Sequence, residues 1–203
     1  MGILTRLKLG PADHNQPLTW EEYQAAEYQP GYRYELIHGR LYVSPAPKLP
    51  HDRHVQFMDR KLYEYSKACP EIFNMVTTGA EVHVPPASGD EEPITCPRPD
   101  VSAYKKVPPR RDLQWEDISP FLVVEVLSPD NIEKDLGRNL VLYHRVPTIK
   151  EYWVVDGLTD PDRPSMRVYR RWGQKWRRID VPFDTVYTTP HLPGFALRMN
   201  PWV

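Results

Sequence analysis

Two acidic residues lie inside strongly apolar segments of this 203-residue chain, where a charge is costly. Asp100 follows Pro99 and opens the segment DVSAY, and Glu125 lies within FLVVEVLSP. Burying an unpaired carboxylate costs several kcal/mol unless a cation or a set of hydrogen bonds compensates it. We therefore interpret the two acids as candidate ligands of a divalent metal ion.

A third acid, Glu35, lies in the alternating segment YRYELI, and a helix predicted to begin near Asp135 has basic residues close to its start. Oxygen ligands favour a hard cation such as Mg²⁺ or Mn²⁺ over zinc. Such an ion can polarise a phosphoryl group and activate a water, so these residues suit metal-assisted hydrolysis of phosphodiester bonds. Two other interpretations stay open from the residues alone: structural carboxylates at a sheet edge or loop mouth, and a glycosidase with paired carboxylates and no metal.

Patterns in the surrounding sequence predict the elements that must position these acids. The segment FLVVEVLS is almost entirely apolar, as expected for a central strand that is covered on both faces. A helix over about residues 135–145 and a strand EYWVVD follow it. This strand–helix–strand order predicts the parallel or mixed sheet of an α/β protein.

The N-terminal half predicts two helices and a hairpin. Thr19 and Glu22 form a capping-box signature at the start of a short helix. The segments YRYELI and RLYVSP alternate on either side of His38-Gly39, as in a hairpin with a tight turn. The segment HDRHVQFMDRKLYEYSKA has apolar residues every three to four positions, which predicts a long helix with one buried face. Further strands are expected at FNMVTT, EVHV and DVSAY.

The length and the ends of the chain favour a single domain. Residues 1–17 contain glycine and proline with little periodicity, so we expect an N-terminal arm that is loosely packed. Residues 18–203 are expected to form one domain with a sizeable core. Near its end, the segment MRVYRRWGQKWRRID predicts an added β-hairpin that turns at Gly173.

Composition excludes several classes of protein. The net charge of -1 gives no global attraction to nucleic acid, so any such contact must be a local patch. Cys69 and Cys96 match no zinc or redox spacing, and the N-terminus lacks the apolar core of a signal peptide. We therefore expect a cytoplasmic protein, and one with no membrane partner, because no apolar run approaches the roughly 20 residues of a membrane span.

Several segments, in their order and spacing, resemble the Uma2 family of restriction-endonuclease-like proteins, part of the PD-(D/E)XK nuclease superfamily. They are YELIHGRLYVSPAP, RPDV, LVVEVLSPD, LYHR and EYWVVD, and the resemblance spans about Thr19 to Phe195. It implies a restriction-endonuclease-like α/β fold with a central mixed sheet flanked by helices. It also implies that Asp100 and Glu125 hold Mg²⁺ or Mn²⁺, and that Glu35 is the acid that often completes the site.

The chain departs from the superfamily at the catalytic lysine. The motif would place it at position 127, which is Leu127, and similar family members carry it four residues after Asp135, which is Asn139 here. An amide can orient water or bind a phosphate oxygen, but it supplies no positive charge. Lys134, just before the predicted helix, is favoured over Arg138 as the substitute. The other interpretation is that these two cations form a solvated pair on the helix surface.

Basic residues near the C-terminus are interleaved with aromatic residues over positions 166–180. This mixture suits a phosphate backbone with stacked bases, although it also suits the solvated face of a hairpin. The loop VPPRRD offers a second basic site. The candidate nucleic-acid contacts are Arg110, Arg111, Arg138, Arg170, Arg171 and Lys175.

Two histidines, His51 and His54, lie three residues apart at the start of the long predicted helix. We interpret them as polar residues of the helix start rather than as metal ligands or a general base. His54 matches a histidine that similar family members often carry, so it alone is kept as a second candidate, for a supporting position behind the metal ligands.

The first functional hypothesis is a metal-dependent DNA endonuclease. In it Asp100 and Glu125 bind the metal, Glu35 assists, and Lys134 or Asn139 positions water and phosphate. The alternative is a non-catalytic nucleic-acid-binding or interaction module that kept the fold and lost the lysine. DNA is the expected partner, and a homodimer would suit double-strand cutting.

Overall fold

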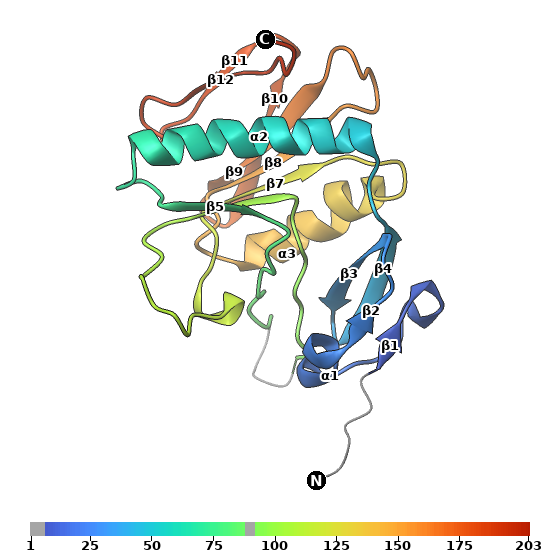
Figure 1. The fold of residues 1–203 in the computed structure, drawn as a ribbon. Coiled ribbons are helices and arrows are strands. Elements are labelled where there is room, and N and C mark those ends of the chain that lie inside the picture. The colour runs from blue at the N-terminus through green and yellow to red at the C-terminus, as the bar shows by residue number, and fades with distance from the viewer. Residues whose placement is uncertain (1–6, 88–91) are drawn as a thin grey trace.

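The computed structural model describes residues 7–87 and 92–203. Six strands form a mixed sheet in the spatial order β10-β9-β8-β7-β6-β5. The central strands β7 (Leu122–Val126) and β8 (Glu151–Asp156) are parallel, and the other neighbours are antiparallel. Helix α2 (Leu49–Ala68) covers one face and α3 (Asn139–Arg145) covers the other (Figure 1). The predicted α/β fold with a central mixed sheet flanked by helices is confirmed.

The central strands are apolar because both of their faces are covered. Every residue of β7 and β8 is buried. Val124 faces the core under α2, where Met58 and Leu62 pack, and Val123 faces the core under α3, where Leu142 packs. Because side chains alternate across a strand, Glu125 lies on the α3 side of the sheet together with Val123.

The crossover from β7 to β8 begins with a π-helical turn, η3 (Lys134–Arg138), that continues into α3. The amide of Asn139 donates to the carbonyl of Lys134, five residues earlier, which closes the wide ring of this turn. The predicted helix therefore exists, but its first turn is π rather than α.

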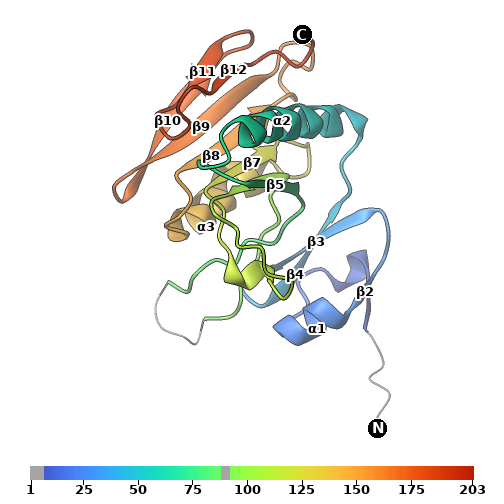
Figure 2. The ribbon, with the colours of Figure 1, turned by 60° about the vertical axis from the view of Figure 1, so that its left-hand side comes forward.

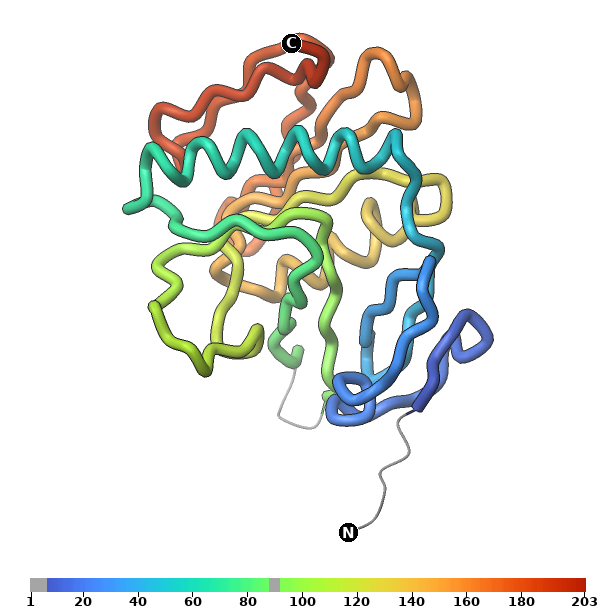
Figure 3. Tube along the Cα trace, in the orientation of Figure 1, coloured from blue at the N-terminus to red at the C-terminus, as the bar shows by residue number. Residues whose placement is uncertain are grey.

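The hairpin of β3 (Tyr32–Ile37) and β4 (Arg40–Pro45) stands beside the sheet. His38 and Gly39 at its turn have φ of 49° and 68°, and two successive left-handed residues make the tight turn that matches strand twist. Figure 3 follows the chain from β4 directly into α2. The hairpin thus holds Glu35 beside the sheet, next to Arg98 and Lys134.

The N-terminal segment packs against this hairpin. It contains β1 (Lys8–Leu9), η1 (Pro11–Asp13), α1 (Trp20–Ala25) and β2 (Glu27–Tyr28). The side chain of Thr19 accepts the hydrogen bond from the Glu22 amide that the capping box predicts. Leu9 is 3% exposed and joins a hydrophobic cluster with strand β3. Residues 7–17 are therefore attached to the neighbouring strands rather than loose, and the rest of the expected arm, residues 1–6, lies outside the described residues.

The remaining strands complete one edge and the C-terminal end. Strands β5 (Met75–Thr78) and β6 (Val101–Tyr104) pair at the edge, and η2 (Trp115–Asp117) precedes β7. The segment EVHV forms no regular strand; only Val82 and Val84 donate backbone hydrogen bonds, to Pro97 and Thr95. No helix in the described part of the chain is long and apolar enough to cross a membrane.

The predicted C-terminal hairpin is present as β9 (Ser165–Trp172) and β10 (Lys175–Val181), and it extends the main sheet. Its turn contains Gly173 with a φ of 57°. Strands β11 (Val186–Thr188) and β12 (Ala196–Arg198) form a small separate sheet beside the hairpin (Figure 2). Leu197 of β12 belongs to the core under α2, so this small sheet closes that core.

A buried ion pair joins these C-terminal strands to the sheet. Glu151, at the start of β8 and 1% exposed, accepts hydrogen bonds from the side chains of Arg170 at 2.6 Å, Tyr187 at 2.9 Å and Thr189 at 2.6 Å. The Trp153 indole donates to the same carboxylate at 2.8 Å. One carboxylate therefore satisfies donors from three segments.

We expect Glu151→Ala to lower the free energy of unfolding by about 2–4 kcal/mol, because it leaves the half-buried Arg170 guanidinium and three further donors without this acceptor. Urea denaturation followed by tryptophan fluorescence measures the loss. Asp180→Ala is the matched control, since Asp180 pairs with Arg178 on the exposed side of the same hairpin. A Glu151→Ala protein as stable as the control would contradict the structural role.

Candidate active site

Four buried carboxylates gather where the β3–β4 hairpin meets the sheet. Glu35 comes from β3, Asp100 precedes β6, Glu125 lies in β7, and Asp135 lies in η3. All four residues are at most 5% exposed. Such a concentration of buried acids requires nearby cations, protons or hydrogen-bond donors.

Asp100 is held in its ionised form. Its Oδ1 lies 2.5 Å from Nη1 of Arg33, and its Oδ2 accepts the Val126 amide at 2.8 Å and lies 3.1 Å from Nε2 of His51. Burial alone would raise the pKa of this carboxyl, but the His51 hydrogen bond and the Arg33 charge outweigh burial and lower the pKa to about 2. Asp100 is therefore an anion at neutral pH.

Glu125 has the opposite character. Its Oε1 accepts hydrogen bonds from the Asn139 amide and the Tyr143 hydroxyl, both at 2.9 Å, whereas no residue in the described ranges donates to Oε2. Burial raises the pKa of Glu125 well above its ordinary value, and the charges of Asp135 and Asp100 add to the rise despite the opposing charge of Lys134. Oε2 of Glu125 is therefore available to a ligand, and a bound cation would favour the ionised form of this carboxyl group.

Glu35 is compensated by two cations and a backbone amide. Its Oε2 accepts from Nη2 of Arg138 at 2.7 Å, and its Oε1 accepts the Arg98 amide at 2.9 Å and lies 3.8 Å from Nζ of Lys134. Burial opposes ionisation, but Lys134 and Arg138 outweigh it and lower the pKa of Glu35. Glu35 thereby anchors both cations of η3 at the site.

Lys134 is the buried ammonium group of the cluster. Its side chain is 9% exposed, and its Nζ lies 3.5 Å from Oδ1 of Asp135. Burial would lower the pKa of this lysine, but Glu35, Glu125 and Asp135 raise it, so the charge persists. The interpretation of Lys134 and Arg138 as a solvated surface pair is therefore wrong, because Glu35 binds both of them inside the protein.

The π turn explains how Lys134 and Asn139 come to the same place. In an α-helix these residues would point about 140° apart. Because η3 closes an i→i+5 ring, they lie above one another instead. The side-chain amide of Asn139 donates to Glu125 at 2.9 Å and to Asp135 at 3.3 Å. Asn139 therefore provides hydrogen bonds to the acids, whereas Lys134 provides the positive charge.

Several residues of the cluster escaped prediction from the sequence. His51 contacts Asp100, whereas the histidine expected to support the site, His54, lies against Gly157 and Trp202. Tyr143 lies in the hydrophobic core under α3, and its hydroxyl donates to Glu125. Arg33 gave one available signal: it lies two residues before Glu35, so both side chains project from the same face of a strand.

Asp135 is a further member, and the sequence placed it only at the start of a helix. It is 1% exposed, and burial raises its pKa to about 7 even though the Lys134 charge acts in the other direction. The Tyr152 hydroxyl fixes its backbone carbonyl at 2.8 Å. Asp135 therefore belongs to the same cluster as Glu125, because the side-chain amide of Asn139 donates to both.

The donor set fits a hard divalent cation. Within residues 7–87 and 92–203, no group of three or more His, Cys, Asp or Glu side chains is arranged as a ready metal cage. Mg²⁺ does not need one, because it keeps several waters and is held by one or two carboxylates together with substrate phosphates. The unengaged Oε2 of Glu125 matches that requirement.

The predicted nucleic-acid contacts are not gathered on one surface. Arg170 pairs with Glu151, and Arg171 donates to backbone carbonyls at the end of α3 and after it, so both guanidinium groups are engaged inside the molecule. Arg138 belongs to the acidic cluster. Three exposed cations remain at the periphery: Arg110 and Arg111 in the loop between β6 and β7, and Lys175 at the start of β10.

Comparison with known proteins adds the family. A profile described as "Uma2: Putative restriction endonuclease" matches residues 20–200. The chain belongs to the Uma2 family. No curated protein matches its sequence.

The Uma2 fold is also seen in a solved structure. A crystal structure from Anabaena variabilis ATCC 29413, described as "a putative nuclease belonging to DUF820", superposes on this Uma2 chain with a TM-score of 0.66 at 20% sequence identity. The match covers 90% of this chain and 96% of the other. At this identity the similarity shows that the two proteins share a fold.

Proposed function

We propose that this Uma2 protein is a metal-dependent DNA endonuclease that hydrolyses phosphodiester bonds. The observation that carries the proposal is the buried ammonium group of Lys134 among the acids Glu35, Glu125 and Asp135. A lysine beside buried carboxylates is what the superfamily motif requires, and here it comes from the π turn rather than from position 127. Membership of a family described as "Putative restriction endonuclease" supports the same activity.

In this proposal Asp100 and Glu125 hold Mg²⁺ or Mn²⁺. The bound ion would supply charge for the phosphoryl oxygens and acidify a water. Lys134 would stabilise the negative charge that develops on the phosphate, because its ammonium is fixed before the substrate binds. Glu35 orients Lys134 and Arg138, and the side-chain amide of Asn139 orients Glu125.

The residues that contact Asp100 favour a second candidate function, a nucleic-acid-binding module without catalytic activity. Both oxygens of this carboxylate already have protein partners, Arg33 on one side and His51 with the Val126 amide on the other. If Asp100 kept these partners permanently, it would not be free to bind a metal ion. The protein would then bind nucleic acid without cutting it. The non-catalytic module is therefore the rival that the experiment must separate from the enzyme.

Metal removal tests the proposal directly. Purified protein is expected to nick or linearise supercoiled plasmid DNA with Mg²⁺ or Mn²⁺ and to leave it intact in EDTA, because the carboxylates alone do not activate the water. Gel electrophoresis over a time course measures the conversion, and restoring the metal after EDTA should restore it. Binding of DNA without cleavage under either metal would reject the enzyme and favour the non-catalytic module.

A further inference from the structure

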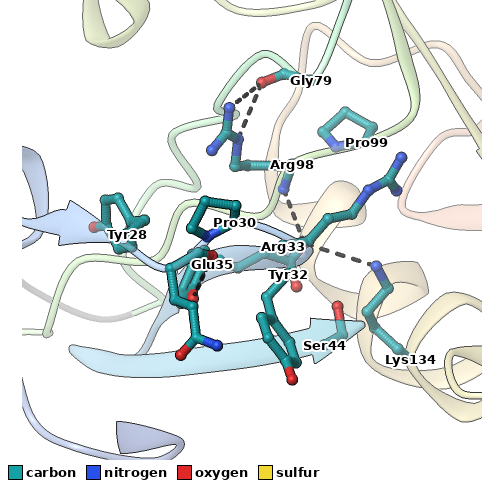
Figure 4. Close-up of a pocket in the computed structure, with 12 residues that line it drawn as sticks. Tyr28, Pro30, Tyr32, Arg33, Glu35, Ser44, Gly79, Arg98, Pro99 and Lys134 are labelled. Atoms are coloured by element: carbon teal, nitrogen blue, oxygen red, sulfur yellow. Dashed lines mark hydrogen bonds and ion pairs between the residues drawn. The ribbon is translucent and has the colours of Figure 1, made fainter. Parts of the chain in front are cut away.

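A pocket of about 350 Å³ lies directly beside the acidic cluster. It is formed by the β2–β3 segment, the residues before β6, and the start of η3 (Figure 4). Its size is at the lower end of ligand-binding pockets, so it suits one small group rather than a double helix. The side chains with the chemistry to bind a ligand are Tyr28, Gln29, Tyr32, Arg33, Arg98 and Lys134.

The pocket and the cluster share residues. Arg33 lines the pocket and contacts Asp100, while Glu35 and Lys134 line it and contact each other. Pro99, which also lines it, is the chain neighbour of Asp100. A group held in the pocket is therefore next to any phosphate positioned at the acids.

Cations outnumber acids in the lining. Arg33, Arg98 and Lys134 line the pocket against one acid, Glu35, which already has three partners. Arg98 uses Nε and Nη2 to bind the Gly79 carbonyl, and Arg33 uses only Nη1 among the described contacts. Remaining guanidinium donors can bind phosphate oxygens, so the lining favours an anionic ligand.

The lining also offers an aromatic ring and an amide. Tyr28 is not available to a ligand, because its hydroxyl donates to the Tyr23 carbonyl and its ring centroid lies 4.5 Å from that of Tyr34. Tyr32 is half-buried and its side chain packs against the hydrophobic cluster that contains Leu9, but among the described residues its ring has no aromatic partner and its hydroxyl no hydrogen bond, and it also lines the pocket. The exposed amide of Gln29 can both donate to and accept from a base edge.

We propose that this pocket binds one unpaired nucleotide of the substrate strand, with its base stacked on Tyr32 and an adjacent phosphate at the acidic cluster. The inference rests on the proposed function and specifies its substrate: DNA that is single-stranded, or unpaired at the cleaved position. Stacking on an aromatic ring combined with cationic contacts to the backbone is how single strands are bound without reading a duplex. A paired base could enter only after leaving the helix.

Binding in EDTA tests the pocket without requiring catalysis. Fluorescence anisotropy with a labelled 12-nucleotide single strand and with its duplex gives the two dissociation constants, and we expect the single strand to bind at least about tenfold more tightly. Tyr32→Ala should weaken single-strand binding by about tenfold, whereas Tyr32→Phe should bind like the wild type, because the ring provides the stacking. Tyr63→Ala, an exposed tyrosine on α2, is the matched control and should change nothing.

Two further measurements keep the inference testable if Tyr32→Ala does not fold. A 2-aminopurine base within the strand should be quenched on binding to the wild type, and Gln29→Ala should weaken binding by about threefold. Equal affinity for strand and duplex, or unquenched 2-aminopurine, would overturn the pocket assignment. Tighter binding of free deoxyadenosine monophosphate than of the strand would overturn it too. Failure to cleave both plasmid and single-stranded DNA with Mg²⁺ or Mn²⁺ would reject the proposed function and leave these binding results to decide the pocket separately.

Discussion

Glu125→Gln is expected to reduce metal-dependent cleavage of DNA by at least about a thousandfold, since in the proposed function Glu125 is a ligand of the metal ion, which would contribute several kcal/mol to catalysis. Asp100→Asn should reduce cleavage as strongly. Both changes keep the size of the side chain. Initial rates on plasmid DNA with saturating Mn²⁺ measure the loss.

The two variants are expected to differ in stability, and that difference separates a metal site from a structural one. Burial and neighbouring acids disfavour the charge of Glu125, so Glu125→Gln should leave the melting temperature unchanged or raise it. Arg33 and His51 favour the charge of Asp100, so Asp100→Asn should lower the melting temperature at neutral pH.

A surface variant provides the control for both. Glu64 is exposed on α2, and Glu64→Gln should leave both the cleavage rate and the melting temperature unchanged. Retained cleavage in Glu125→Gln would remove this residue from the metal site. Such a result would favour a purely structural cluster.

Replacing Lys134 by methionine should lower the single-turnover cleavage rate by about 10²–10³-fold, because it removes a preorganised charge from the developing transition state. Methionine keeps most of the stem, and Arg138 still pairs with Glu35, so the site should stay folded. Rapid-quench measurements at saturating DNA give the rate, and anisotropy gives the affinity. Lys67→Met, an exposed lysine at the end of α2, is the matched control.

A rescue variant sharpens this prediction. Adding Asn139→Lys to Lys134→Met places a lysine where similar family members carry it, and part of the lost rate should return. An equal loss of affinity and rate in Lys134→Met would instead make Lys134 a ground-state phosphate contact. An unchanged rate would exclude Lys134 from the chemistry.

The central layers of this protein could be predicted from the sequence because its patterns are local. The apolar run around Val123 and Val124 indicates a strand buried on both faces, and the hairpin follows from the His38-Gly39 turn. The packing of residues 8–17 could not be predicted in the same way. The burial of Leu9 depends on a hydrophobic cluster whose other members are distant in sequence.

Part of the acidic cluster could also be predicted from local sequence patterns. Carboxylates inside apolar strands are conspicuous, so Asp100 and Glu125 stand out, and Glu35 stands out through its alternating strand. Their partners His51 and Tyr143 do not, because each occupies a helix position that packing alone explains. Their hydrogen bonds to the acids are seen only in the three-dimensional structure, where α2 brings His51 to Asp100 and α3 brings Tyr143 to Glu125.

A turn closed by i→i+5 hydrogen bonds holds one residue more than the corresponding α-helical turn. Relative to a homologue with a regular helix here, every residue after the extra one gains a number without changing its place in space. In this chain the ammonium group comes from the opposite side of Asp135: Lys134, the residue before it, lies 3.5 Å from its carboxylate and is missed when a lysine is sought only after Asp135. Uma2 sequences that lack a lysine after this acid should therefore be compared by superposition before any is classed as an inactive descendant of a nuclease.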